Sequence, residues 1–479
     1  MTQNIMLTPD EFCDALAKGL GRAVRHVREV SADMVRNMLL EACLRCKTYD
    51  TQCEGYRTSW LFNMVELTGE SDYYREKILE AIPASRDTDD YNFWQLFYLI
   101  KEYAIRGDEE CRTALYREFD LMVDDNNIGG ADAIIEIDGL TGLLHVLEIA
   151  GLRIRNGGDI WWEVSYQIEK SEEKFGKDVV HNAIEAEALR NEFVRTYCEE
   201  KENVCTRDDF GISVIDNQMA EVISRTPPQN EEKTAKRPIS EWIAGILSDD
   251  FDDDDIRSTT EDNIVARLCL RHRFLSSRGR GRVFDDEEVE AVWSVLISEE
   301  NPYRLFCLLN PFGSVKRLRL PRFDPKFLAW IDAPRPLSGK AAQVLAKMSD
   351  ELIRLKALEL LQTVPPKQNW YDGFELILSS FQPEDEKTIT TALQTHHLPH
   401  VGCLHNVGMD IIKLAETWPN VTFREPLLWF YDRTPCSLCR LRIVEELDKR
   451  QLVPKEIWKE CVDDCDDQLR ELALERNHE

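Results

Sequence analysis

The chain has 479 residues, of which 43% are hydrophobic, and its formal net charge at pH 7 is -29. This length exceeds what one compact core can hold, so we expect either two or more domains or an elongated array of repeats. The 88 Asp and Glu residues outnumber the 59 Lys and Arg residues, which argues against non-specific binding to nucleic acids or acidic membranes.

The start of the chain predicts a helix and no secretory signal. Thr8 can cap the helix, Pro9 suits its first position, and the acids that follow suit its positive end. No run reaches the length of about 18 apolar residues that is needed to cross a bilayer. We therefore predict a cytoplasmic protein without a membrane partner, whose 14 cysteines are mostly reduced and buried.

Amphipathic helical segments dominate the rest of the chain. Residues 31–46 and 90–107 place apolar side chains at helical spacing. Further amphipathic segments cover residues 163–175, 178–197, 286–297 and 337–362. A short β-like run at residues 134–137 leads into a segment that reads more naturally as a buried helix. The sequence therefore predicts an all-α fold.

A local pattern recurs, in which an acid is followed by an arginine one turn later and then by apolar residues. It occurs at Asp72/Arg75, Asp108/Arg112, Asp350/Arg354 and Asp466/Arg470. We interpret each occurrence as the first turn of a helix that carries an internal ion pair and then buries Leu or Ile. Several such helices, each opening the second helix of a pair, indicate stacked helical hairpins.

Two of these segments, DELIRLKALELL and DDQLRELAL, resemble the second helix of HEAT-type repeats. The chain also resembles a set of uncharacterised bacterial HEAT-like proteins, over most of residues 35–479. The similar segments are YDTQCEGYRTSWLFNMVELTG, IDGLTGLL, LLWFYDRTPCSLCR and ECVDDCDDQLRELAL. The resemblance implies an α-solenoid of stacked antiparallel helix pairs with a binding or scaffolding role, and it implies no active site.

The middle of the chain interrupts this pattern. Residues 203–240 are polar and rich in proline, and six acids fall between Asp249 and Asp255. We therefore predict N-terminal helical repeats over residues 1–202, an irregular acidic linker or insertion over 203–262, and C-terminal HEAT-like repeats over 263–479.

Four cysteines near the C-terminus form a CxxC and a CxxxC: Cys436, Cys439, Cys461 and Cys465. This spacing is near the range of structural zinc sites, in which four thiolates fill a tetrahedral shell. The spacing also suits two facing helices in which cysteine acts as a small apolar residue, and this packing interpretation is favoured. Apart from this possible zinc, the sequence predicts no cofactor.

A second cluster of potential ligands comprises His396, His397, His400, Cys403 and His405. It suits a transition-metal site or a pH-sensitive loop. The alternative is a connection between helices with mostly exposed histidines, in which His405 caps the next helix. The cluster contains no carboxylate and no HExxH, which argues against a catalytic zinc site.

Candidate surface contacts fall in two places. The first is a basic run made of Arg271, Arg273, Arg278, Arg280 and Arg282. These arginines could hold phosphates, or they could neutralise the nearby acids. The second is the stretch that carries Trp429, Tyr431 and Arg433, although aromatic residues at helical spacing are more often part of a core.

The sequence thus predicts a non-enzymatic interaction scaffold that binds a protein or peptide, which the acidic charge suggests is basic. The alternative is a nucleic-acid-binding protein similar to helical-repeat DNA glycosylases. The basic residues concentrate in one segment instead of recurring along the repeats, which weakens that alternative. HEAT-like bilin lyases offer a further analogy of fold alone, with nothing here that indicates a tetrapyrrole site.

Overall fold

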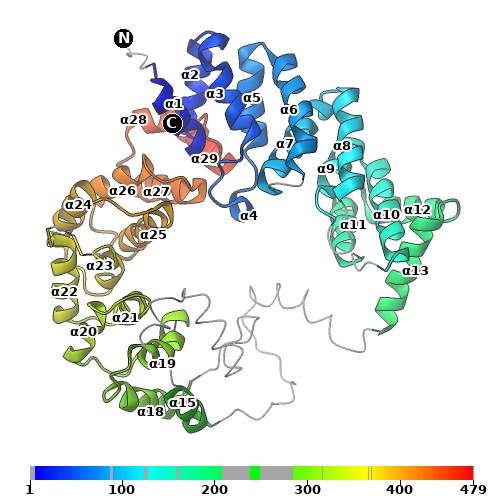
Figure 1. The fold of residues 1–479 in the computed structure, drawn as a ribbon. Coiled ribbons are helices and arrows are strands. Elements are labelled where there is room, and N and C mark those ends of the chain that lie inside the picture. The colour runs from blue at the N-terminus through cyan, green and yellow to red at the C-terminus, as the bar shows by residue number, and fades with distance from the viewer. Residues whose placement is uncertain are drawn as a thin grey trace. The chain divides into compact units, whose positions relative to one another are not determined.

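The computed structural model describes residues 6–86, 90–122, 128–157, 161–207, 238–248, 284–315, 317–364, 366–367 and 369–477. Every regular element in these ranges is a helix, so the predicted all-helical class is confirmed (Figure 1). The β-like run at 134–137 lies within a helix. None of the described helices is both long and apolar enough to cross a membrane.

The chain divides into two compact units. The first comprises residues 1–229, 435–437 and 454–479, and the second comprises residues 230–434 and 438–453. Most of the predicted linker, residues 203–262, lies outside the described ranges. Its described parts are helical: α13 continues to Arg207, and α15 covers Ile239–Leu247.

The first unit contains helices from both ends of the chain. They are α1 (Pro9–Lys18), α2 (Gly21–Glu29), α3 (Ala32–Leu44), α4 (Thr51–Glu54), α5 (Thr58–Thr68), α6 (Ser71–Ser85), α7 (Asp90–Ile105), α8 (Glu109–Met122), α9 (Ala131–Asp138), α10 (Leu140–Arg155), α11 (Trp161–Phe175), α12 (Lys177–Ala188), α13 (Glu192–Arg207), α28 (Lys455–Cys461) and α29 (Asp467–Asn477).

The first helix begins as the sequence predicts. The Thr8 hydroxyl accepts a hydrogen bond from the Glu11 backbone N–H at 3.3 Å, and the Glu11 carboxylate accepts one from the Thr8 N–H at 2.8 Å. Each side chain thereby satisfies a backbone donor that the start of a helix leaves unpaired. Gly19, with φ 73°, ends the helix in the left-handed conformation that glycine adopts readily.

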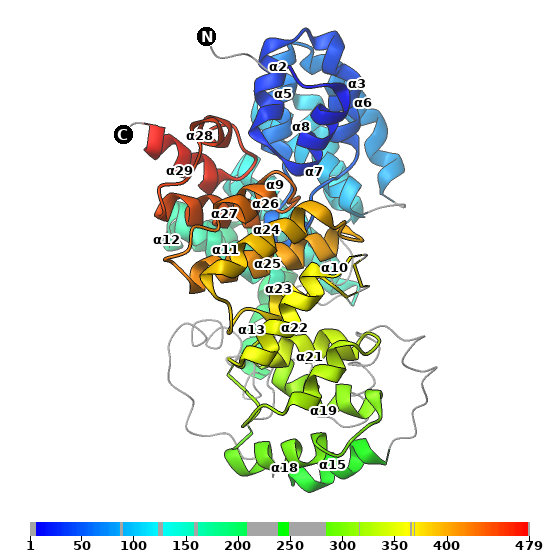
Figure 2. The same ribbon diagram turned by 90° about the vertical axis from the view of Figure 1, so that its left-hand side faces the viewer.

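The C-terminal helices pack on the N-terminal ones within this first unit (Figure 2). Arg22 of α2 pairs with Glu460 of α28 at 2.9 Å, and the Trp60 indole N–H donates to the Asp463 carbonyl at 2.9 Å. A Cβ atom on Gly21 would lie 1.9 Å from the Glu460 carbonyl oxygen. The two backbones therefore approach so closely that only glycine fits at this position.

The second unit contains the remaining helices of the described ranges. They are α15 (Ile239–Leu247), α18 (Asp286–Leu296), α19 (Pro302–Ser314), η1 (Pro325–Phe327), α20 (Leu328–Ile331), α21 (Leu337–Leu345), α22 (Glu351–Gln362), α23 (Asp372–Leu376), η2 (Pro383–Asp385), α24 (Glu386–Thr395), α25 (Val401–Thr417), α26 (Arg424–Tyr431) and α27 (Ser437–Lys449). The predicted segment 337–362 is two helices, because Asp350 caps a new one by accepting the Leu352 N–H.

Helices of the second unit form two rows. In one row α19 contacts α21, α21 contacts α23, and α23 contacts α25; in the other, α22 contacts α24 and α24 contacts α26. Contacts such as those of α22 with α23 and of α25 with α26 join the rows (Figure 1). In the first unit, α1, α3, α5, α7 and α9 likewise contact one another in sequence. Apolar side chains fill the space between these helices.

Arginines link helices that are distant in the sequence, and we call these ion pairs the arginine ladder. Its members are Arg36–Glu70, Arg75–Asp108, Arg112–Asp138 and Arg354–Asp385. In each pair a guanidinium nitrogen lies 2.7–2.8 Å from a carboxylate oxygen. In each pair the acid lies beside the start or end of a later helix.

The ladder corrects the predicted pairing of Arg112 with Asp108 and of Arg354 with Asp350, although both arginines also pair within their own helices, with Glu109 and Glu351. Asp108 and Asp350 each cap their own helix, by accepting the backbone N–H of Cys111 and of Leu352. The arginines one turn later pair elsewhere: Arg112 with Asp138, and Arg354 with Asp385. Three of the four occurrences of the pattern therefore mark contacts between successive helix pairs, whereas Arg470 pairs within its own helix, with Asp467.

Candidate metal centre

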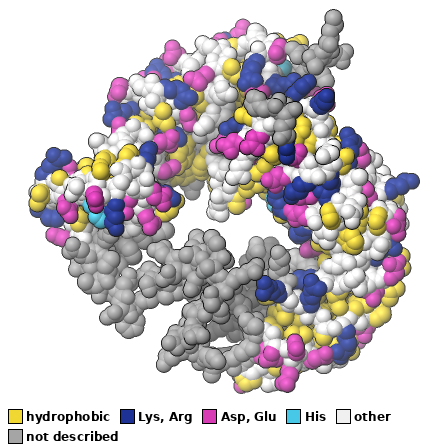
Figure 3. Space-filling model, turned by 180° about the vertical axis from the view of Figure 1, so that it is seen from behind, with side chains coloured by type: hydrophobic (Ala, Val, Ile, Leu, Met, Phe, Trp, Pro, Cys, Tyr) yellow, Lys and Arg dark blue, Asp and Glu magenta, His cyan; other side chains and the backbone are white. Residues whose placement is uncertain are grey.

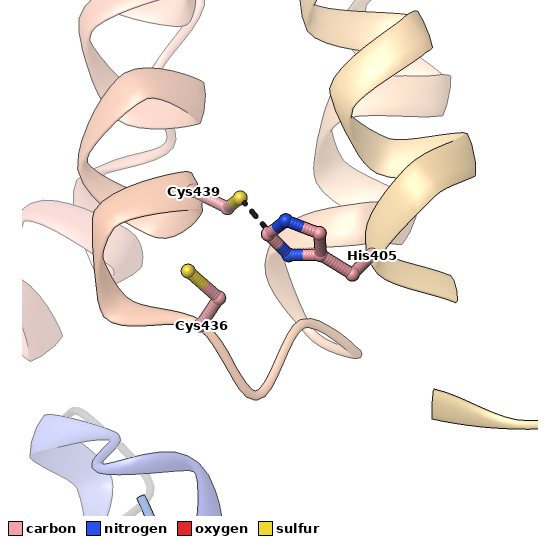
Figure 4. Close-up of side chains that lie close together, drawn as sticks. All are labelled: His405, Cys436 and Cys439. Atoms are coloured by element: carbon pink, nitrogen blue, oxygen red, sulfur yellow. Dashed lines mark hydrogen bonds between the residues drawn. The ribbon is translucent and has the colours of Figure 1, made fainter. Parts of the chain in front are cut away.

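Helices α25 and α27 bring together residues from two of the predicted clusters. His405 belongs to the second turn of α25, Cys439 to the first turn of α27, and Cys436 immediately precedes α27 (Figure 4). The start of α25 is fixed by His400, whose Nδ1 accepts the Cys403 backbone N–H at 3.2 Å. Because Cys436 and Cys439 are three residues apart at the start of one helix, the chain itself holds their thiols close together.

One ligand atom from each of His405, Cys436 and Cys439 lies within 4.8 Å of the other two. Cys439 Sγ is 3.6 Å from His405 Nδ1, and Figure 4 shows both cysteines and the histidine ring directed toward one another. Both cysteines are buried, at 4% and 2% exposure, and His405 is half-buried. Neither cysteine forms a disulfide. Two thiols and an imidazole form a donor set typical of zinc.

Further polar and sulfur groups surround these three residues. Met409, one turn after His405, places its sulfur 3.5 Å from Cys439 Sγ. Arg442 on α27 donates to the Met409 sulfur at 3.4 Å and to Glu416 at 2.6 Å. These contacts connect α25 to α27 independently of any metal. Met409 was not recognised from the sequence, although its i,i+4 spacing from His405 places it on the same helix face.

The other two cysteines of the predicted four-cysteine site lie against the N-terminal helices. Cys461 is buried at the end of α28. The Cys465 backbone N–H donates to the Gly19 carbonyl at 3.0 Å, and a Cβ atom on Gly19 would lie 2.3 Å from Cys465 Sγ. Neither residue is among the three described residues whose ligand atoms come together, which are the two cysteines of the CxxC and His405.

The predicted histidine cluster separates in the structure. His396 is buried, where its ring meets Trp370 edge to face at 4.8 Å and its Nε2 lies 3.2 Å from the Leu361 carbonyl. His397 and His400 are exposed, and His400 Nε2 lies 3.1 Å from Cys403 Sγ. Only His405 joins the group of possible metal ligands.

The predicted contact residues have different positions. Tyr431 is fully buried and belongs to the core, because α26 turns this face toward its neighbours. Arg433 is exposed and stacks over the ring of the half-buried Trp429 at 4.5 Å. The predicted arginines Arg271, Arg273, Arg278, Arg280 and Arg282 lie outside the described residues.

A second group of titratable side chains lies on α23 and α25: Asp372, Glu375 and Asp410, which we call the acidic cluster. Burial raises the pKa of Asp372 to about 6, against the opposing charge of Arg335. Burial and the neighbouring Asp410 also raise the pKa of Glu375, and burial raises that of Asp410. Within the described residues, Asp372 Oδ2 has no hydrogen-bond partner.

A scan against protein-family models and searches of curated proteins and of solved structures found no match for this chain. Its functional interpretation therefore depends on its own residues and geometry.

Proposed function

We propose that this chain is a protein-interaction scaffold, built as a HEAT-like α-solenoid, whose surface binds a basic protein or peptide. The arginine ladder carries this proposal. Ion pairs that join one helix pair to the next are expected where a supersecondary unit is repeated and stacked on its neighbours. The two-row contacts of α19 to α26 also support stacked pairs. Repeat arrays of this kind present extended surfaces for partners.

The charge of the chain favours a basic partner. The net charge of -29 attracts cations and repels polyanions over distances of about 10 Å at 0.1 M salt. Acidic and basic side chains are interspersed over the described part of the face seen in Figure 3. Arg322, which follows the basic run of Arg271 to Arg282 in the sequence, pairs with Glu290 at 2.6 Å and stacks over Trp293.

An open hollow among the described residues of the first unit is a candidate contact surface. It encloses about 650 Å³ and is lined by Glu109, Arg112, Thr113, Tyr116, Thr141, Leu144, His145, Glu148, Glu187 and Arg190. Two of its cations already have partners, since Arg112 pairs with Asp138 and Arg190 pairs with Glu187. The Glu148 carboxylate makes no hydrogen bond or ion pair with the described residues, so a basic side chain of a partner could supply one.

The test is gentle purification of the tagged chain from its host at about physiological salt, with and without nuclease. We expect a stoichiometric protein that survives nuclease and is lost with Glu148→Lys. The matched control is Glu76→Lys, which reverses an exposed acid on α6 and should retain the partner.

Two outcomes would contradict the proposal. Nucleic acid at fixed stoichiometry, lost as salt is raised, would instead support the nucleic-acid-binding alternative. Recovery of the chain alone, in every variant and at every salt concentration, would leave the scaffold proposal without its partner and reject it.

A further inference from the structure

We propose that Cys436, Cys439 and His405 bind one Zn²⁺ ion, which fastens the start of α27 to α25. The proposal rests on the convergence of the three side chains described above, and it is independent of the scaffold function. It differs from the four-cysteine arrangement that the sequence suggested, because Cys461 and Cys465 are not among the three residues whose ligand atoms come together.

The distances fit tetrahedral coordination. With Zn–S bonds of about 2.3 Å and Zn–N bonds of about 2.0–2.1 Å, a ligand sulfur and nitrogen are about 3.6 Å apart, and two ligand sulfurs about 3.8 Å apart. The distance from Cys439 Sγ to His405 Nδ1 is 3.6 Å. All three ligand atoms lie within 4.8 Å of one another, so side-chain rotations that move them by about 1 Å would complete the geometry.

The scaffold holds the ligands in place before any metal arrives. Cys436 and Cys439 lie at the start of α27, where the positive end of the helix dipole favours negatively charged ligands. His405 is fixed on α25, and the Arg442–Glu416 ion pair holds the two helices together nearby. Preorganisation of this kind lowers the cost of ordering the ligands on binding.

Three protein ligands leave one position of a tetrahedral zinc shell for a further donor. Met409 offers a thioether next to Cys439, and thioethers bind Cu⁺ more readily than they bind Zn²⁺. Copper is therefore the competing metal that the test must distinguish. Oxidation of Cys436 and Cys439 to a disulfide is the alternative reaction that would prevent the two thiols from binding a metal.

The experiment uses the full chain, purified under reducing conditions without a metal-binding tag. Metal content is measured by mass spectrometry of the elements, and Co²⁺ is added to the apo-protein as a spectroscopic probe. We expect about one zinc per chain, and with Co²⁺ a thiolate charge-transfer band together with the intense visible bands of a tetrahedral site. Cys439→Ser and His405→Ala should each lower the bound zinc at least about tenfold.

Matched variants separate this site from its alternatives. Cys465→Ser should keep its zinc, whereas a four-cysteine site would lose it. His405→Cys should restore the zinc that His405→Ala loses, which a general folding defect would not allow. If Cys439→Ser does not fold, as judged by circular dichroism, the zinc contents of His405→Ala and His405→Cys still test the proposed site.

Several results would overturn the assignment. They are full zinc occupancy in His405→Ala, loss of zinc in Cys465→Ser, binding of Cu⁺ but not of Zn²⁺, and a Cys436–Cys439 disulfide that persists under the reducing conditions of purification.

Discussion

The arginine ladder and the acidic cluster both contain buried carboxylates, but they differ in how many hydrogen-bond donors and cations surround those carboxylates. In the ladder, Asp385 is 3% exposed and receives the guanidinium of Arg354 together with the Gln382 backbone N–H. In the acidic cluster, Asp372 is similarly buried, but one of its oxygens has no partner among the described residues and two other carboxylates lie nearby. Burial disfavours the ionised form of a carboxylate, and hydrogen-bond donors and cations oppose that effect; Asp385 has more of them than Asp372.

The two regions should respond oppositely to pH. Hydrogen bonds from Arg36 lower the pKa of Glu70 in the ladder, so the stability from this pair is present at neutral pH and is lost as the pH falls. The acidic cluster has raised pKa values. Folding favours the protonated form of these three carboxyl groups. Their contribution to the free energy of unfolding is therefore present in acid and is lost as the pH rises through their raised pKa values. Arg335, Lys340 and Lys413 are the cations that oppose this shift.

The largest effect should come from Arg354→Ala in the ladder. This change leaves Asp385 buried without its guanidinium partner, and we expect a loss of about 3 kcal/mol in the free energy of unfolding. Urea unfolding at pH 7 measures it. Arg322→Ala is the control, because its pair with Glu290 is half-exposed and should cost less than about 1 kcal/mol. Equal losses in the free energy of unfolding of Arg354→Ala and Arg322→Ala would contradict a special contribution of the ladder.

Asp372→Asn should act in the opposite direction. The shift of this pKa from 3.8 to about 6 corresponds to about 3 kcal/mol at most, so the neutral side chain should stabilise the protein at pH 8. Near pH 4 the variant and the original chain should unfold with similar free energies. Hydrogen exchange at α23 and α25 across this range reports the change, and unaltered exchange at pH 8 would contradict it.

Asp108→Asn tests the ladder at a more exposed pair. Burial alone would raise the pKa of Asp108, but the Cys111 N–H and Arg75 outweigh it and lower the pKa. We expect a loss of about 1 kcal/mol at pH 7, because asparagine keeps the cap but loses the charge. The loss should diminish as the pH falls through the lowered pKa of Asp108, which urea midpoints at several pH values would show. A loss that persists in acid would mean that the charge is not responsible.

The smallest effect should come from Arg36→Gln, because the Arg36–Glu70 pair is solvated on both sides. We expect a destabilisation that disappears at about 1 M NaCl, where the Debye length is about 3 Å. Thermal unfolding at low and high salt measures it. A salt-independent loss would indicate packing by the arginine stem rather than charge.

The sequence predicts local features well and partners at a distance poorly. The cap at Thr8 and the helix at Asp286–Leu296 follow from residues that are neighbours in the chain. The recurring acid and arginine were noticed, but their partner was misassigned. The acid's oxygens already bond to backbone N–H groups of its own helix, so the arginine reaches the next pair about 30 residues on.

The candidate metal centre shows the same limit. Cys436, Cys439 and His405 were all noticed, but in separate clusters, because no local pattern shows that α25 lies against α27. Cys461 is near the CxxC in sequence, yet it lies with the N-terminal helices because α28 packs on α2. Spacing along the chain predicted which residues could bind a metal, and tertiary packing determined which of them meet.

The packing of α28 on α2 also bears on how the protein is made. Arg22 and Glu460 are 438 residues apart, so most of the chain is synthesised between the two halves of this ion pair. At a synthesis rate of about 5–20 residues per second, at least about 20 seconds pass between the synthesis of the N-terminal helices and that of the helices that cover them. The surface beneath α28 is exposed throughout that time. The N-terminal helices of this sequence are therefore completed only after α28 has been synthesised.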